Sequence, residues 1–244
     1  MHDTCIFDLY GTLVDIRTDE KKKELWDRLA LFYAFYGADY TPCELHHAYD
    51  CLTAEMSAGK GGIRKDAHEA YPEIRIEEVF LALFKEKGVN ADEVLARHAG
   101  QFFRILFIYH LRLYDGTEEM LSALKNSGKK IYLLTNAQKI FTEYEMNALG
   151  ITLYFDGIFI SSEHECKKPD VRFFEKLIHT YGIDRDRAVM IGNDGVCDIE
   201  GAEKAGLATL YVKTEISPKE ELPKADHVLD KMDTKLMTQI LLAE

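Results

Sequence analysis

The alternation of apolar and polar positions divides the chain into three stretches. A short apolar run at Thr4–Phe7 stops at an aspartate followed by a glycine, the pattern of a buried strand that ends in a loop. From about residue 19 to residue 112, apolar side chains such as Leu25, Leu29 and Phe32 recur every three or four positions, which predicts amphipathic helices. After residue 114 the pattern changes to short apolar strands that alternate with helices.

The third stretch predicts a parallel sheet. Because its strands are separated by helices, the sheet should carry helices on both faces and bind ligands beyond the carboxyl ends of its strands. The fold class is therefore α/β, a Rossmann-like parallel sheet with an inserted all-helical domain at residues 16–112, while residues 1–15 and 113–244 form the core. The expected strands lie at 130–134, 157–160, 188–191, 209–212 and 227–229, and the expected helices at 117–126, 140–149, 171–181, 199–205 and the C-terminus.

The composition and net charge of the chain exclude some classes of function. The chain has 244 residues, of which 47% are apolar, as in ordinary globular proteins. Its formal net charge of −12 disfavours nucleic acid as a partner, because such binding depends on neutralising phosphates. No apolar run is long enough to span a membrane and the N-terminal residues do not resemble a signal peptide, so we expect a cytoplasmic protein. The cysteines contain no Cys-x-x-Cys pair and are expected to be mostly reduced core thiols: Cys5, Cys43, Cys51, Cys166 and Cys197.

Polar residues follow several of the predicted strands. Asp8, with Gly11 in the turn after it, has the position of a nucleophile, although an isolated Asp-x-x-Gly more often only starts a turn. Thr135 and Asn136 come between a strand and a helix, where they fit either a helix N-cap or an anion site. Lys168 belongs to a Lys-Lys pair, which is usually a solvated surface feature.

The strand at 188–191 is followed by an acidic loop. This loop contains Asn193, Asp194 and Asp198 around a glycine turn. Carboxylate and amide oxygens suit Mg²⁺, which keeps several waters and takes one or two carboxylates together with a substrate phosphate. The loop is therefore a candidate magnesium site.

In this order and at these strand ends, the motifs resemble those of the haloacid dehalogenase superfamily of hydrolases, and the resemblance covers essentially the whole chain. Three connecting segments, at residues 114–117, 155–163 and 198–202, are similar to those of its phosphatase-rich subfamily. In that subfamily a helical cap domain is inserted after the first motif. The resemblance therefore implies that residues 16–112 are such a cap.

The resemblance also implies roles for the residues at the strand ends. Asp8 would attack phosphorus to form an aspartyl-phosphate that water later hydrolyses. The Thr135 hydroxyl and the amides around Asn136 would hold the phosphoryl oxygens, and Lys168 would neutralise charge. Substrate contacts are expected from Gly11, Thr135, Asn136 and Lys168. The Mg²⁺ ligands are expected from the Asp8 carboxylate, the Tyr10 backbone carbonyl and the acidic loop residues Asn193, Asp194 and Asp198.

The chain departs from the family pattern at Tyr10. Most phosphatases of the family carry there an aspartate that acts as general acid and base, whereas a tyrosine is familiar from the haloacid dehalogenases, which attack carbon and need no metal. Against dehalogenation, Asp194 and Asp198 are present, residues 32–40 contain no arginine that would read a halide, and Phe174 stands where dehalogenases tend to carry tyrosine. The balance favours Mg²⁺-dependent hydrolysis of a small phosphomonoester, with metal-independent 2-haloacid dehalogenation as the alternative.

A second departure is Asn193, which occupies the position of a directly coordinating aspartate and leaves either its own amide oxygen or Asp194 to bind the metal. Together with Tyr10 it raises a third hypothesis, a non-catalytic phosphate-binding relative, against which Asp8, Thr135 and Lys168 argue. We expect the substrate to be a small phosphorylated metabolite. Cap residues 56–65 include glycines and the cations Lys60 and Arg64, which could close over an anionic substrate, although such a segment is more often an exposed polar loop. The sequence does not distinguish a monomer from a homodimer.

Overall fold

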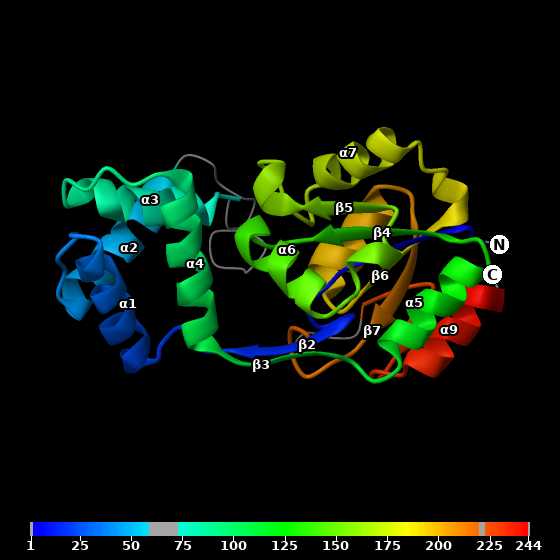
Figure 1. The fold of residues 1–244 in the computed structure, drawn as a ribbon. Helices are drawn as coiled ribbons and strands as arrows, with labels where there is room; N and C mark the ends of the chain where they lie inside the picture. Colours follow the sequence, from blue (N-terminus) through cyan, green and yellow to red (C-terminus); the bar gives the residue numbers. More distant parts are fainter. Residues whose placement is uncertain (1, 59–72, 220–222, 244) are drawn as a thin grey trace. The chain divides into compact units, whose positions relative to one another are not determined.

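The computed structural model describes residues 2–58, 73–219 and 223–243. The chain divides into two compact units (Figure 1). The sheet unit comprises residues 1–16, 111–137 and 145–244, and the helical unit comprises residues 17–110 and 138–144. The predicted cap segment Met56 to Lys65 lies largely outside the described residues, since 59–72 are not among them.

The sheet unit contains six parallel strands in the order β5-β4-β1-β6-β7-β8, as expected for a Rossmann-like α/β fold. The strands are β1 (Thr4–Phe7), β4 (Lys130–Thr135), β5 (Gly157–Ile160), β6 (Ala188–Gly192), β7 (Ala208–Val212) and β8 (His227–Leu229). The helices of this unit are α5 (Thr117–Asn126), α7 (Val171–Tyr181), α8 (Gly201–Lys204) and α9 (Thr234–Ala243). Helix α6 (Lys139–Ala148) begins in the helical unit and ends in the sheet unit.

Apolar burial on both faces fixes the central strands. Ile6 and its neighbours on one face pack against Phe173 and Phe174 of α7, while Phe7 points to the opposite face because side chains alternate along a strand. Phe7 is in register with Leu133 of β4 and with Ile191 of β6. The residue after Phe7 therefore emerges at the level of Leu134 and Gly192, and three strand ends meet at one edge of the sheet.

The helical unit is built around an aromatic core. Its helices are α1 (Lys23–Phe35), α2 (Pro42–Ser57), α3 (Ile76–Glu86) and α4 (Glu93–Phe107). Tyr33, Phe80 and Phe103 are almost completely buried in this core. Helix α2 begins at a capping box in which Thr41 and Glu44 satisfy each other's backbone N–H groups.

The expectation that residues 19–112 are helical throughout is wrong at the end of that stretch. Helix α4 ends at Phe107, and Ile108–Leu113 form strand β3, which pairs with β2 (Val14–Thr18) in a two-stranded sheet. Residues 108–113 carry β-branched and aromatic side chains near their start, which favour an extended backbone. Because apolar residues before residue 108 recur with helical spacing, the sequence pattern did not reveal the change from helix to strand at that point.

The helix expected at residues 199–205 starts earlier than predicted. A π-helical segment at Gly195–Glu200 precedes the short α8. It begins there because the Asp194 carboxylate accepts hydrogen bonds from the backbone N–H groups of Val196 and Cys197. Short 3₁₀ turns complete the sheet unit at Thr152–Tyr154, Ser161–Glu163 and Arg185–Arg187.

All five cysteines are reduced, and three of them are core thiols, in line with the expectation that most are. Cys5, Cys166 and Cys197 are buried, whereas Cys43 and Cys51 are exposed on α2. Helical periodicity places Cys43 and Cys51 on the same side of α2, two turns apart.

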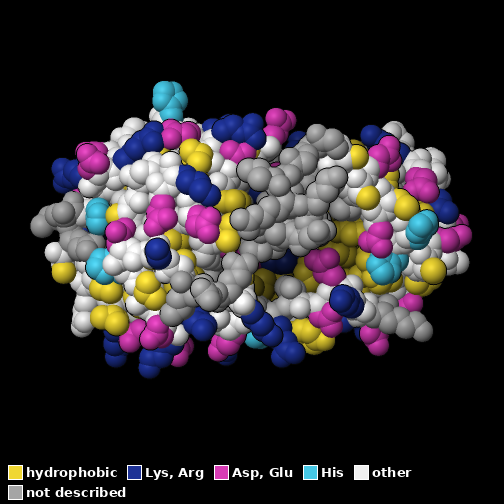
Figure 2. Space-filling view, turned by 180° about the vertical axis from the view of Figure 1, so that it is seen from behind, with side chains coloured by type: hydrophobic (Ala, Val, Ile, Leu, Met, Phe, Trp, Pro, Cys, Tyr) yellow, Lys and Arg dark blue, Asp and Glu magenta, His cyan; other side chains and the backbone are white. Residues whose placement is uncertain are grey.

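The described surface mixes charges of both signs. On the face drawn in Figure 2, Lys and Arg side chains are interspersed with Asp and Glu side chains. Among the described helices, none is both long and apolar enough to cross a bilayer.

Candidate active site

Asp8 lies at the edge where the strand ends meet. It follows β1, and its backbone N–H donates to the carbonyl of Ile191 on β6 at 2.9 Å, which extends the parallel pairing by one residue. The residue as a whole is only 8% exposed. A carboxylate so buried requires partners, because an isolated charge is costly away from water.

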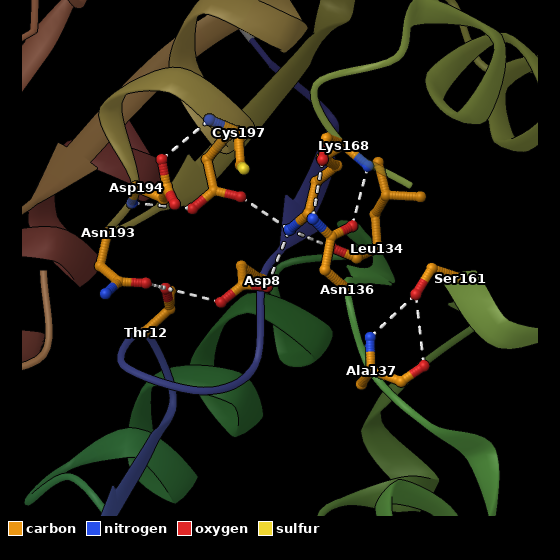
Figure 3. Close-up of polar contacts among 11 residues, drawn as sticks. Asp8, Thr12, Leu134, Asn136, Ala137, Ser161, Lys168, Asn193, Asp194 and Cys197 are labelled. Atoms are coloured by element: carbon orange, nitrogen blue, oxygen red, sulfur yellow. Dashed lines mark hydrogen bonds and ion pairs between the residues drawn. The ribbon is translucent and has the colours of Figure 1, made fainter. Parts of the chain in front are cut away.

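The main partner of Asp8 is Lys168, whose side chain is 1% exposed (Figure 3). The Nζ atom donates to Asp8 Oδ1 at 2.7 Å, to Asp198 Oδ1 at 2.6 Å and to the Leu134 carbonyl at 2.7 Å. An ammonium group has three protons, so all of them are used. Lys168 is therefore a buried charge at the centre of the site and not a solvated surface lysine.

Charge and burial act in opposite directions on this cluster. Burial lowers the pKa of Lys168, but the adjacent carboxylates of Asp198 and Asp8 outweigh it, and the pKa is raised above its usual value. Burial raises the pKa of Asp198 to about 7, although Lys168 opposes this shift. The Asp198 and Asp8 carboxylates share one ammonium group, so the cluster is net negative and attracts cations whenever both carboxylates are ionised.

Gly192 makes room for Asp198. A Cβ atom on Gly192 would lie 2.2 Å from Asp198 Oδ2 and 2.4 Å from its Cβ atom, so a larger residue at this strand end would displace the carboxylate. Asp198 Oδ2 also accepts a hydrogen bond from the backbone N–H of Asp194 at 3.0 Å. Both Asp198 oxygens are thus engaged within the protein.

Thr12 connects Asp8 to the acidic loop. Its hydroxyl lies 3.4 Å from Asp8 Oδ2 and 3.3 Å from Asn193 Oδ1, and its single proton can serve only one of these acceptors at a time. Two oxygens with one proton between them form an oxygen-rich position that suits a hard cation such as Mg²⁺. Gly11, with φ of +89°, brings the turn close to Asn193, whose Nδ2 atom would lie 2.4 Å from an added Cβ.

Two side chains, each with two hydrogen bonds to backbone groups, hold the loop after β4 in place (Figure 3). Asn136 Nδ2 donates to the Lys168 carbonyl and its Oδ1 accepts from the Lys168 N–H, both at 2.8 Å. Ser161 Oγ accepts from the Ala137 N–H at 2.9 Å and donates to the Ala137 carbonyl at 3.2 Å. Among the amides around Asn136 that the resemblance implies would hold a phosphate, the Ala137 N–H is bonded here to Ser161, and the Asn136 side chain is bonded to the Lys168 backbone.

Tyr10 points to a different partner. Its phenolic hydroxyl donates to Oε2 of Glu145 on α6, and Glu145 is only 3% exposed. Both residues belong to the sheet unit. The side chain in the family's acid–base position is therefore coupled to a buried carboxylate.

The acidic loop contributes less free carboxylate than its sequence suggests. Asp194 Oδ1 caps the π-helical segment, and Asp198 is bonded to Lys168 and to the Asp194 N–H. Within the residues that the structure describes, no group of three or more His, Cys, Asp and Glu side chains is arranged to hold a metal ion. The oxygens that fit a cation best are the pair from Asp8 and Asn193 at Thr12.

The structure thus joins Asp8, Lys168, Asp198 and Asn136 in one hydrogen-bonded network, and Thr12 connects this network to Asn193. Thr135 ends β4, buried, directly before this network. Three residues that build the site were not predicted from the sequence: Thr12, Glu145 and Ser161. Thr12 directly follows Gly11 in the first motif, and Glu145 has a visible signal, since it follows Phe141 by four positions on the buried side of α6.

A family model described as haloacid dehalogenase-like hydrolase matches residues 2–206. Among curated proteins, the chain is 29% identical over 186 residues to the glyceraldehyde 3-phosphate phosphatase of Methanothermobacter thermautotrophicus, covering 68% of this chain and 76% of that protein. It is 25% identical over 238 residues to the pyrimidine 5'-nucleotidase PynA of Streptococcus pneumoniae, covering 86% and 99%.

Solved structures share the fold over almost the whole chain. A 2-haloacid dehalogenase from Pseudomonas syringae superimposes with a TM-score of 0.68 at 20% identity, covering 100% of this chain and 99% of that chain. The hydrolase YfnB from Bacillus subtilis, solved bound to magnesium, gives a TM-score of 0.56 at 20% identity, with 98% of each chain covered. At this identity the likeness concerns the fold alone.

Proposed function

The chain belongs to the haloacid dehalogenase-like hydrolases, and we propose that within this family it hydrolyses a small phosphomonoester through an aspartyl-phosphate on Asp8. The observation that carries the proposal is the oxygen pair at Thr12, Asp8 Oδ2 and Asn193 Oδ1, which share one hydroxyl proton. Such a position suits Mg²⁺. Hydrolysis of a carbon–halogen bond does not need a metal ion, so this position favours phosphate chemistry. Relatives named as phosphatases support the same reaction class.

In the proposed reaction, Asp8 is the nucleophile and Lys168 is the cation that positions it. A carboxylate oxygen of Asp8 attacks phosphorus, the bond from phosphorus to the substrate's ester oxygen breaks, and the alcohol leaves with a proton taken from the medium or from a protein group. Water then attacks the aspartyl-phosphate, which restores the carboxylate and releases inorganic phosphate. Throughout, Lys168 holds Asp8 in place and offsets its negative charge.

Magnesium fits the residues present. It would be held by the Asp8 carboxylate, the Asn193 amide oxygen and the Tyr10 backbone carbonyl, with Asp194 and Asp198 adding negative charge from the loop. When bound, it would screen the charge between the carboxylate and the incoming phosphate. Because an amide replaces one carboxylate, we propose that this site binds Mg²⁺ more weakly than a site with two carboxylates.

We further propose residues 1–15 and 113–244 as the catalytic core and residues 16–112 as a cap that reads the substrate. A small phosphorylated metabolite is the proposed substrate, in line with the substrates after which the phosphatase relatives are named. A cytoplasmic location and a monomeric or homodimeric state stay predictions of the sequence.

The second candidate function is metal-independent 2-haloacid dehalogenation, which Tyr10 favours. A direct comparison separates the candidates: phosphate release from a panel of sugar, nucleotide and organic acid phosphates, and chloride release from a 2-haloacid, each with and without EDTA. We expect phosphate release that EDTA abolishes and added Mg²⁺ restores. Chloride release that ignores EDTA would establish the dehalogenase instead, and phosphate binding without either release would establish a non-catalytic relative.

A further inference from the structure

Asn136 uses both ends of its carboxamide on one residue. Its Nδ2 atom donates to the Lys168 carbonyl and its Oδ1 atom accepts from the Lys168 N–H, each at 2.8 Å (Figure 3). The two residues are 32 positions apart in sequence and follow different strands, β4 and β5. This reciprocal pair imitates the hydrogen bonding of a neighbouring strand and fixes the Lys168 backbone next to the end of β4.

The position of the Lys168 backbone matters because its side chain is long. Four methylene groups separate the backbone from Nζ, and Nζ must reach the Asp8 and Asp198 carboxylates and the Leu134 carbonyl together. Leu134 lies on β4, two residues before Asn136, so the lysine is attached to the same strand end through its backbone and through its ammonium group. Misplacement of a catalytic group by about 1 Å costs about 10²-fold in rate.

The other side of the same loop is fixed independently. Ser161, which follows β5 and is fully buried, bonds both the N–H and the carbonyl of Ala137. The Asn136 backbone therefore lies between Leu134, whose carbonyl accepts from Lys168 Nζ, and Ala137, whose backbone is bonded to Ser161. The Asn136 side chain is directed at Lys168. One Nδ2 proton is committed to the Lys168 carbonyl, and rotation of the carboxamide toward a substrate would break both hydrogen bonds to Lys168.

We infer that Asn136 is a positioning residue that acts through Lys168 and not a ligand of the phosphoryl group. The inference rests on the proposed function for its kinetic part, since Lys168 matters to turnover only if Asp8 is the nucleophile. Its structural part, the fixation of the Lys168 backbone, is independent of the reaction. The two parts can be measured separately.

The test compares Asn136→Ala with Asn136→Asp. Alanine removes both hydrogen bonds, whereas aspartate keeps an oxygen that accepts from the Lys168 N–H but places a second carboxylate oxygen, in place of the donor, against the Lys168 carbonyl. Asn147→Ala is the matched control, because Asn147 lies in the same unit and its side chain accepts one exposed hydrogen bond from Thr152. For each variant we would measure kcat and KM on an aryl phosphate, inhibition by inorganic phosphate, and amide hydrogen exchange at residues 166–170.

A positioning role predicts that Asn136→Ala lowers kcat by about 10- to 100-fold, as expected for a displaced catalytic group. It also predicts unchanged phosphate inhibition and faster exchange of the Lys168 amide. Asn136→Asp should keep most of the exchange protection and an intermediate kcat, and Asn147→Ala should match the wild type. If Asn136→Ala does not fold, Asn136→Asp alone still decides, through its kcat and its exchange protection.

A phosphate ligand would behave differently. In that case Asn136→Ala would raise KM and weaken phosphate inhibition at an unchanged kcat, with Lys168 exchange as in the wild type, and the inference would be overturned. Failure of the proposed function is a separate result, because it appears as a wild-type protein that releases no phosphate. Hydrogen exchange at Lys168 still tests the structural part in that protein.

Discussion

The Tyr10 hydroxyl donates its only proton to the buried carboxylate of Glu145. A phenol has one donor, so in this structure Tyr10 has no proton directed at a leaving group. The pKa of a phenol in water, near 10, is also poorly matched to proton transfer at neutral pH. The acid–base function that the family usually places here is therefore not supplied by Tyr10 as the structure shows it.

The first prediction concerns leaving groups. An aryl phosphate leaves without protonation, so the wild type should turn it over far faster than an alkyl phosphate, and the aspartyl-phosphate should accumulate because its attacking water is not activated. Tyr10→Asp should raise kcat on the alkyl phosphate, by up to the 10²- to 10⁴-fold that general acid–base catalysis typically provides. Rates on both substrates and the intact mass of quenched enzyme measure this.

Two further variants show whether the new carboxylate causes the change in rate. Tyr10→Phe keeps the ring but not the hydroxyl, and its alkyl phosphate rate should stay low. Because Tyr10→Asp would place a second carboxylate near buried Glu145, the double variant with Glu145→Gln removes the repulsion and should gain at least as much. Equal wild-type rates on both substrates, with no trapped phosphoenzyme, would show that another group already supplies the proton.

The second prediction concerns the nucleophile. Asp8→Asn keeps the shape of the side chain but cannot attack phosphorus, so kcat should fall well below a tenth of the wild-type value, a difference of about 1.4 kcal/mol in barrier. No phosphoenzyme should form. Asp186→Asn makes the same substitution at an exposed position of the sheet unit and should leave kcat unchanged. Appreciable turnover by Asp8→Asn would assign the nucleophile elsewhere.

The third prediction concerns Lys168, whose removal leaves Asp8 and Asp198 buried without their cation. Lys168→Ala should lower the free energy of unfolding by about 3 to 5 kcal/mol, the usual cost of breaking a buried ion pair from one side. It should also reduce kcat by at least about 10²-fold, as for loss of an electrostatic stabiliser. Urea unfolding and kinetics on an aryl phosphate measure the two effects.

A double variant separates charge from packing at Lys168. Adding Asp198→Asn removes one of the uncompensated carboxylates, so part of the lost stability should return while kcat stays low. If Lys168→Ala is as stable as the wild type, the ammonium does not hold the two carboxylates together as the structure indicates.

The fourth prediction concerns the metal. Asn193→Asp replaces an amide oxygen with a carboxylate in the oxygen pair at Thr12, so the Mg²⁺ concentration that gives half-maximal activity should fall by about tenfold or more, since Mg²⁺ prefers charged oxygen ligands. The Thr214 hydroxyl, which now accepts from Asn193 Nδ2 at 3.4 Å, can rotate to donate to the new carboxylate. A magnesium titration of activity measures the shift, and an unchanged midpoint would exclude residue 193 from the metal site.

The sequence predicted the parts of the site that strand ends determine. Asp8, Thr135 and Asn193 directly follow or end buried strands, and parallel strands bring such positions to one edge regardless of their distance along the chain. The strands of the sheet could also be predicted, because short apolar runs that alternate with helices have few alternatives to a parallel sheet. The two strands at the ends of the helical block, β2 and β3, were missed because each is stabilised by pairing with the other.

Side-chain direction was not predictable in this way. The pattern places Asn136 and Tyr10 at the site but does not say that one bonds the Lys168 backbone and the other Glu145, since both contacts depend on segments 32 and 135 positions away. The same limit applies to Lys168, whose burial between two carboxylates cannot be told from its local sequence. Contacts of this kind are set by tertiary packing.

The distribution of cysteines has a practical consequence for spectroscopy. The two exposed thiols, Cys43 and Cys51, are both on α2 of the helical unit, while the three in the sheet unit are buried. A maleimide dye offered to the native chain would therefore label the helical unit alone. The anisotropy of that dye would follow the tumbling of this unit as substrate is added, without any engineered attachment point.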